Sequence, residues 1–109
     1  MRRRQTFQDE LRSATADIVR LLLHKAALAN RLSKLAPNAC GRRMLRRQKT
    51  LAILQLLECN AATVDELLFP QRLVGVRLVN GRRLHVPLDH LPVHVRRQLA
   101  TFVHRDVAA

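Results

Sequence analysis

The hydrophobic positions between residues 7 and 35 predict one long helix. Apolar side chains recur there at alternating spacings of four and three, and only Lys25 interrupts them. The stripe consists of Phe7, Leu11, Ala14, Ile18, Leu21, Leu28, Leu32 and Leu35. Further apolar side chains widen it, namely Val19, Leu22, Ala26 and Ala29. We therefore expect more than one neighbouring element to pack on this helix.

A second helix is predicted from about residue 40 to residue 58, after Pro37 and Asn38 end the first one. Because the connection is short, the two helices should form an antiparallel hairpin. A heptad stripe also suits pairing with a second copy of the chain. Packing of helix 7–35 within the chain and across a homodimer therefore both stay open.

The segment Thr63-Val64-Asp65-Glu66 has the pattern of a capping box, in which a Thr and a Glu satisfy the first backbone N–H groups of a helix. It predicts a short helix that Pro70 closes.

Residues 73–88 predict a β-hairpin, because two alternating runs flank an Asn-Gly pair. A two-residue turn would mix apolar and polar side chains on both faces. A three-residue loop at 79–81, with Gly81 at positive φ, pairs Val76 with Leu84 and collects the apolar side chains on one face. The other face and the tip then carry Arg77, Arg82, Arg83 and His85.

Pro87 has no N–H to donate, so the second strand of this hairpin should lie at a sheet edge. A last helix is expected from Pro92 to about Val107. The predicted fold class is therefore α+β and mostly helical, with a long N-terminal helical hairpin, a short helix, one β-hairpin and a C-terminal helix. We expect a single domain over residues 1–109, in which residues 1–6 form a flexible basic N-terminus.

The charge of the chain indicates which class of partner it binds. The chain of 109 residues has a net charge of +12, and 17 of its 20 basic residues are Arg. Residues 1–60 carry 13 basic and 4 acidic side chains, so most of the excess lies there. This balance indicates a polyanion or an acidic protein surface as the partner.

Two groups of cations are the candidate binding residues. One lies at the start of the second predicted helix and consists of Arg42, Arg43, Arg46, Arg47 and Lys49. Cations oppose the helix macrodipole there, whereas a docked anion would meet both the free N–H groups and the arginines. The other group is Arg77, Arg82 and Arg83 on the β-hairpin, which could contact the DNA backbone as the wing of a winged-helix protein does.

The aromatic residues indicate how the chain would contact a nucleic acid. The chain has no Trp or Tyr, and Phe7, Phe69 and Phe102 all occupy positions that we expect to be buried. Proteins that bind single strands stack bases on exposed aromatic rings. Contact with the phosphate backbone is therefore favoured over base stacking.

Metal, cofactor and catalytic chemistry find little support in the sequence. Pro92 separates His90 from His94, and Cys40 and Cys59 lack the close spacing of zinc ligands. No pair of carboxylates suits acid–base catalysis, and no glycine-rich phosphate loop is present. We expect no metal, no cofactor and no enzymatic activity. No apolar run is long enough to cross a membrane, so we expect a soluble, cytoplasmic protein.

Two functions remain, and they belong to different classes. The first is a small basic nucleic-acid-binding protein, a regulator of transcription or an accessory factor, that contacts the backbone of duplex DNA or structured RNA. The second is an adaptor or inhibitor of the kind that phages and plasmids encode, which docks on an acidic surface of a host protein. The same arginines would serve either function.

Overall fold

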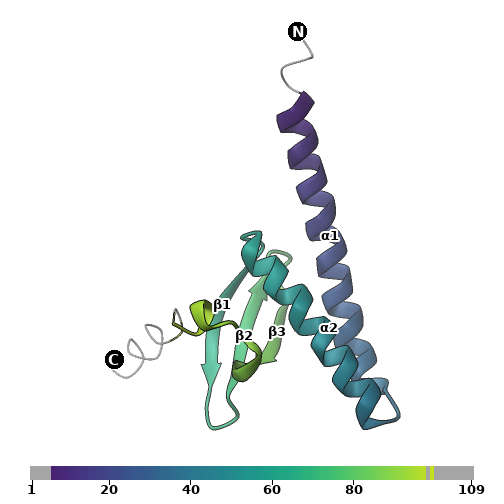
Figure 1. The fold of residues 1–109 in the computed structure, drawn as a ribbon, viewed down its shortest axis with the longest axis vertical. Coiled ribbons are helices and arrows are strands. Elements are labelled where there is room, and N and C mark those ends of the chain that lie inside the picture. Colours follow the sequence, from purple (N-terminus) through teal and green to yellow (C-terminus); the bar gives the residue numbers. More distant parts are fainter. Residues whose placement is uncertain (1–5, 98, 100–109) are drawn as a thin grey trace. The chain divides into compact units, whose positions relative to one another are not determined.

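The computed structural model describes residues 6–97 and 99, and the fold class is α+β and mostly helical, as predicted. Figure 1 shows, in chain order, α1 (Thr6–Leu35), α2 (Ala39–Glu58), β1 (Ala62–Leu68), β2 (Leu73–Leu78), β3 (Arg83–Pro87) and the short 3₁₀ turn η2 (Leu88–His90). Residues 93–97 and 99 are helical, which places a short C-terminal helix close to where the sequence predicts it. The remainder of that helix and residues 1–5 of the predicted flexible N-terminus lie outside the described residues, whereas Thr6 already belongs to α1.

The chain divides into two compact units, residues 1–61 and residues 62–109. The first is the helical hairpin and the second contains the sheet, and each is described by itself. That the 109 residues form one domain stays a prediction.

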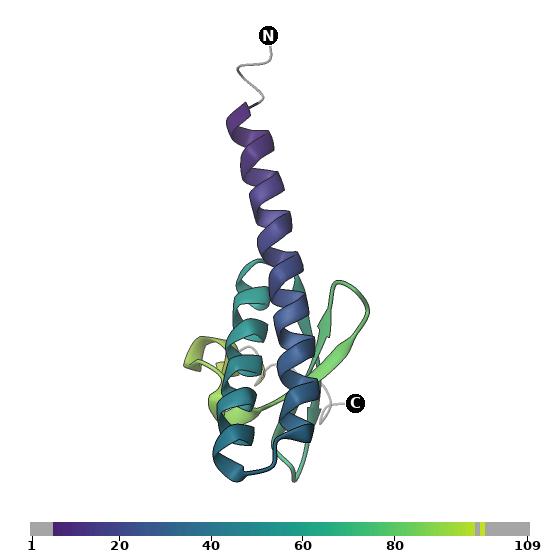
Figure 2. The same cartoon turned by 90° about the vertical axis from the view of Figure 1, so that its right-hand side faces the viewer.

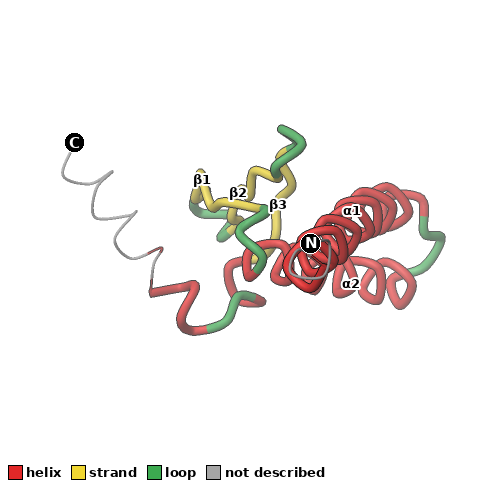
Figure 3. Tube along the Cα trace, turned by 90° about the horizontal axis from the view of Figure 1, so that it is seen from above, coloured by secondary structure: helices red, strands yellow, loops and turns green. Residues whose placement is uncertain are grey.

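The two long helices form the predicted antiparallel hairpin, joined by a loop at residues 36–38 (Figures 2 and 3). Asn38 begins α2, because its side-chain Oδ1 accepts a hydrogen bond of 2.7 Å from the N–H of Gly41. Gly41 therefore belongs to the first turn of α2. With 30 residues against 20, α1 is longer than α2 by about 15 Å, so its N-terminal part extends past the end of α2.

The face of α1 that is buried is different from the predicted stripe. It consists of Leu22, Ala26, Ala29 and Ser33, three of which belong to the apolar or small side chains beside the stripe. Small side chains allow two helices to approach closely, which explains why α2 packs here. The stripe itself lies largely on the surface, so it is not the packing face within the chain.

The sheet is antiparallel with strand order β1-β2-β3. Val76 pairs with Leu84, and the N–H of Leu78 donates to the carbonyl of Arg82 at 2.7 Å. Gly81 has a φ of 87°. The three-residue loop is therefore confirmed, as is the position of the strand with Pro87 at the sheet edge.

Residues 62–68 form strand β1, so the short helix predicted from the capping box is wrong. Val64 pairs with Val76 and Glu66 pairs with Gly75, which leaves Asp65 as the extra residue of a β-bulge. The capping-box prediction is wrong because Glu66, its second member, pairs within the ladder and binds Arg83 of β3, so it does not cap a helix.

The second unit buries one face of the sheet. The buried side chains there are Val74, Val76, Leu78, Leu84 and Val86. They are the apolar set that the register of the hairpin predicts. Leu91, Val95 and Leu99, which follow the sheet at intervals of four, are buried as well. The opposite sheet face carries the charged side chains of Glu66, Arg77 and Arg83.

Candidate phosphate-binding surface

The exposed basic face of α2 is formed by Arg43, Arg46 and Arg47. Their spacing of three and four places them on one side of the helix, next to its N-terminus. All three are exposed, and none forms an ion pair with a residue that the structure describes. The first turn of α2 contains no acidic residue to balance them. These three cations are therefore available to an external anion.

The other two predicted cations of α2 have contacts inside the hairpin. Arg42 is half-buried, and its Nη1 donates to the carbonyl of Ala36 at 3.2 Å, near the C-terminal end of α1. A cation is favourable at this negative end of the helix dipole. Lys49 is also half-buried and donates from Nζ to Oδ1 of Asn30 at 3.3 Å. Burial lowers the pKa of the Lys49 amine, and the positive charges of Arg46 and Lys34 lower it further.

Lys34 belongs to the basic surface although the sequence reasoning missed it. The last turns of α1 lie beside the first turns of α2, so Lys34 is close enough to Lys49 to lower the pKa of its amine. The sequence contains a signal that could have revealed this surface: residues 18–57 include nine Lys or Arg and no Asp or Glu. Folding this stretch back on itself concentrates its charge, because no acid within it offsets the cations.

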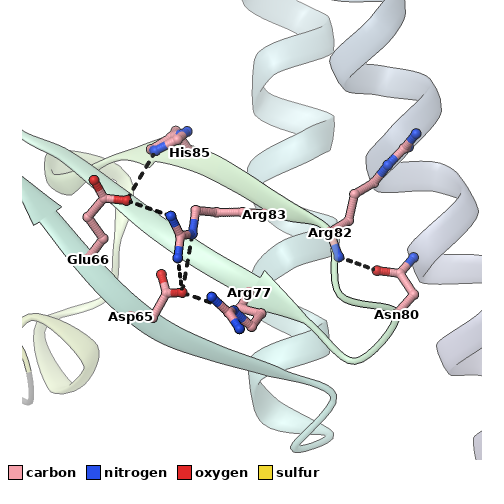
Figure 4. Close-up of polar contacts among 7 residues, drawn as sticks. All are labelled: Asp65, Glu66, Arg77, Asn80, Arg82, Arg83 and His85. Carbon is pink, nitrogen blue, oxygen red and sulfur yellow. Dashed lines mark hydrogen bonds and ion pairs between the residues drawn. The ribbon is translucent and has the colours of Figure 1, made fainter.

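The arginines of the sheet have a different environment, which Figure 4 shows. Oδ2 of Asp65 accepts from Nη2 of Arg83 at 2.8 Å and from Nε of Arg77 at 3.2 Å. Nη1 of Arg83 also donates to Oε2 of Glu66 at 3.3 Å, and Nε2 of His85 lies 3.8 Å from the same oxygen. Arg77 and Arg83, two of the predicted binding residues, therefore pair with acids of their own sheet.

The β-bulge makes this ion-pair cluster possible. Successive residues of a regular strand point to opposite faces, yet Asp65 and Glu66 both contact Arg83. Gly75, which pairs with Glu66, leaves the space that the two acids occupy. A Cβ at Gly75 would lie 2.9 Å from the Cβ of Glu66 and 3.3 Å from Oδ1 of Asp65. That Oδ1 atom is buried and accepts no hydrogen bond from the described residues.

Two further arginines lie in the turns of the sheet. Nη2 of Arg72 donates to Oδ1 of Asp89 at 2.7 Å, and this hydrogen bond together with the positive charge lowers the pKa of the Asp89 carboxyl. Arg82 lies at the tip of the hairpin and points away from the cluster (Figure 4). Its side chain forms no ion pair within the described part of the chain. Among the three predicted binding residues of the β-hairpin, Arg82 alone is available to an external anion.

The expectation that the aromatic rings are buried is wrong for two of the three. Phe7 is 70% exposed and Phe69 is 57% exposed, and Phe102 lies outside the described residues. Phe7 belongs to the exposed stripe of α1, and Phe69 stands alone in the turn after β1. The two rings belong to different units, so they do not form a stacking platform within either unit.

Within residues 6–97 and 99, no three His, Cys, Asp or Glu side chains gather in a way that suits a metal ion. Cys40 and Cys59 are free and exposed. None of the described helices combines the length and the apolar character needed to cross a membrane.

Comparison of the chain with family models, with characterised proteins and with solved structures gives no significant match.

Proposed function

We propose that the basic end of the helical hairpin binds the phosphate backbone of a nucleic acid, duplex DNA or structured RNA. One observation carries the proposal: Arg43, Arg46 and Arg47 are exposed and form no ion pair with a described residue, in a stretch of 40 residues that contains no acid. The protein would act as a regulator or accessory factor in the cytoplasm. We also propose that it is a dimer through α1, whose exposed apolar stripe supports such a contact.

The physical basis is the uncompensated charge of this end. Each phosphate that a cation neutralises releases condensed counterions, so binding is favoured without any recognition of base sequence. Arginine adds a planar fork that matches two phosphate oxygens. The N–H groups at the start of α2 contribute a further favourable field for an anion. These contacts position the protein on a backbone and carry little sequence information.

The test compares two variants that lose the same charge. Replacing Arg43, Arg46 and Arg47 by Gln should reduce the affinity for a fluorescent duplex of random sequence about 100-fold at low salt, as measured by anisotropy. The slope of log K against log salt should fall by about 2.7, since each lost phosphate contact removes about 0.9. The control replaces Arg12, Arg96 and Arg97, which are exposed outside this surface, and should change both values far less. Equal losses in the two variants would show that net charge alone attracts the duplex.

A second candidate is the adaptor that docks on an acidic protein surface. It is favoured by Met44 and Leu51, large apolar side chains on α2 that are 60% and 46% exposed and that phosphate binding does not require. Replacing both by Ser should leave duplex binding intact under the first proposal. Under the second, the full chain should retain a protein from a nuclease-treated lysate and lose it with this variant. An affinity for duplex DNA and RNA that is absent at about 50 mM salt would exclude the first proposal.

A further inference from the structure

The apolar stripe of α1 is the largest uncovered feature of the helical hairpin. Its exposed large side chains are Phe7, Leu11, Ile18, Leu21, Leu32 and Leu35, which are 39% to 72% exposed. They repeat at alternating spacings of four and three along one side of the helix. Such a seam is typical of a helix that packs against another helix along its length.

The stripe is separate from the face that α2 covers. At 100° per residue, the centre of the stripe and the buried face of Leu22, Ala26 and Ala29 lie roughly 100° apart around α1. A second helix can therefore pack on the stripe without displacing α2. Residues 6–18 of α1 are exposed throughout, which leaves this part of the helix open to a partner on the stripe side.

Lys25 discriminates between the two orientations of a pair of α1 helices. It occupies a core position of the stripe, equivalent to those of Leu11, Ile18 and Leu32. In a parallel pair in register, Lys25 of each copy would face Lys25 of the other, and two like charges would meet in the seam. In an antiparallel pair this position faces the other class of core position, which includes the small Ala14. The long side chain of Lys25 can then extend past Ala14 to the surface.

The charges of α1 favour the same orientation. Residues 6–20 contain three acids and two bases, a net charge of −1, whereas residues 21–35 contain three bases and no acid, a net charge of +3. An antiparallel pair places each acidic half beside a basic half. Along the edge of the seam, Glu10 then lies next to Arg31 of the second copy, and Asp17 lies next to His24. A parallel pair would place like halves together.

We infer that two copies of the chain pair along this stripe with their α1 helices antiparallel and with residues 7–32 in overlap. In this register the core layers join Ile18 to Leu21, Leu11 to Leu28, Phe7 to Leu32 and Ala14 to Lys25, each between copies and each occurring twice. The contact has twofold symmetry, with its axis near residues 18–21. It does not depend on nucleic-acid binding, and it places the two basic hairpin ends at opposite ends of the pair.

The first test measures mass and the effect of one core charge. Light scattering of the full chain without nucleic acid should give twice 12.5 kDa at about 100 µM. Leu21→Glu should weaken the pair at least 100-fold, because it buries a carboxylate beside Ile18 in both central layers. Val79→Glu makes a similar change at a side chain that is 61% exposed in the β-hairpin, and it should leave the mass unchanged. A wild-type mass of 12.5 kDa at this concentration overturns the inference.

The second test measures orientation. Cys40 and Cys59 are exposed and free, so both can be replaced by Ser, and one spin label can be placed at Asp9 or at Arg20. Both positions lie on the side of α1 away from the stripe. In the antiparallel pair, the two labels at position 9 should be offset by about 30 Å along the helix axis and the two labels at position 20 should not, so the distance at position 9 should be clearly the longer one. In a parallel pair neither position has an axial offset, so similar distances at the two positions overturn the inference.

A charge exchange tests the register without touching the core. Glu10→Arg should weaken the pair about three- to tenfold, because it faces Arg31 of the other copy at two symmetric places. Adding Arg31→Glu should restore the affinity. Both residues are exposed, so neither change should unfold the hairpin, and circular dichroism checks this. A double variant that is no tighter than Glu10→Arg alone contradicts the register.

Discussion

The helical hairpin and the sheet of this protein carry arginines in opposite circumstances. In the helical hairpin, residues 18–57 contain nine cations and no acid, and Arg43, Arg46 and Arg47 are exposed without an ion pair to any described residue. In the sheet and its turns, residues 62–90 contain four arginines and three acids. Three of those four arginines pair with these acids. All of them are arginines or lysines with the same charge. Their surroundings leave the cations of the first group available to a ligand, whereas most of the second group are held in ion pairs within the sheet.

This difference shows why net charge alone is a poor guide to a binding site. Burial lowers the pKa of the Lys49 amine, and the neighbouring cations Arg46 and Lys34 lower it further, so a polyanion relieves a repulsion that already exists in the helical hairpin. The cations of the sheet have their partners within the chain, and releasing them would leave Asp65 and Glu66 without theirs. For the same number of arginines, an anionic ligand should therefore bind more tightly to the helical hairpin than to the sheet.

The largest expected effect concerns the space that holds the sheet cluster together. Gly75→Ala should lower the free energy of unfolding by about 1–3 kcal/mol, because its Cβ would lie 2.9 Å from the Cβ of Glu66 and force β1 to move. Urea denaturation followed by circular dichroism measures the loss. Gly81→Asn is the control: Gly81 has a φ of 87°, which Asn tolerates, and open space beside it. Equal losses at the two glycines would show that the close approach at Gly75 has no special role.

A smaller effect is expected from Asp65→Asn, which removes the shared negative partner of Arg77 and Arg83. The free energy of unfolding should fall by about 1–2 kcal/mol, since hydrogen bonds to charged groups are lost in a half-buried place. Arg77 also becomes available, while Arg83 keeps its ion pair with Glu66, so the affinity for a duplex should rise a few-fold. This variant tests whether ion pairing is what separates the sheet from the hairpin.

Asp17→Asn provides the matched control for this change. Asp17 pairs with Arg20 at 3.2 Å on the surface of α1, where both side chains are mostly exposed. Losing such a pair should change the free energy of unfolding by less than about 0.5 kcal/mol. If Asp65→Asn costs no more than this, the cluster contributes nothing special to the sheet.

The parts of the fold that follow a regular period could be predicted from the sequence. The bounds of α1 and α2 are close to those expected from the length of the apolar repeats. The three-residue loop before Arg82 is also as expected, because a one-residue shift would move the apolar side chains of the β-hairpin into water. Strand β1 could not be predicted in this way. Its first residues match the local pattern of a helix cap, and only pairing with β2 makes the segment a strand.

The candidate site could be predicted only in part, for a related reason. The run of basic residues on α2 is local in sequence, and the structure leaves three of its five cations exposed without an ion pair. The pairing of Arg83 with Asp65 joins residues 18 positions apart and depends on the strand order, which no local pattern contains. Similarly, the face of α1 that packs on α2 is chosen by small side chains such as Ala26, although the stripe beside it is more hydrophobic.

A last, small effect concerns Lys49, the cation that the helical hairpin half-buries. The pKa of its amine is lowered by burial and by Arg46 and Lys34, so the unfolded chain binds more protons between the folded pKa and 10.5. The free energy of unfolding should therefore rise with pH through this window, and the full cost of the charge should be present below it.

Lys49→Met removes that charge and keeps most of the aliphatic chain, so it should stabilise the hairpin at pH 7. The gain should stay within about 1 kcal/mol, because the hydrogen bond to Asn30 is lost as well. Urea denaturation at pH 7 and pH 10 should show the advantage of the variant shrinking at the higher pH, and Lys34→Met, at an exposed site, should show a smaller gain. A saturating duplex should reduce the advantage, because bound phosphates support the charge that the hairpin alone disfavours. An advantage that is the same with and without duplex would mean that the phosphates do not reach this end of the hairpin.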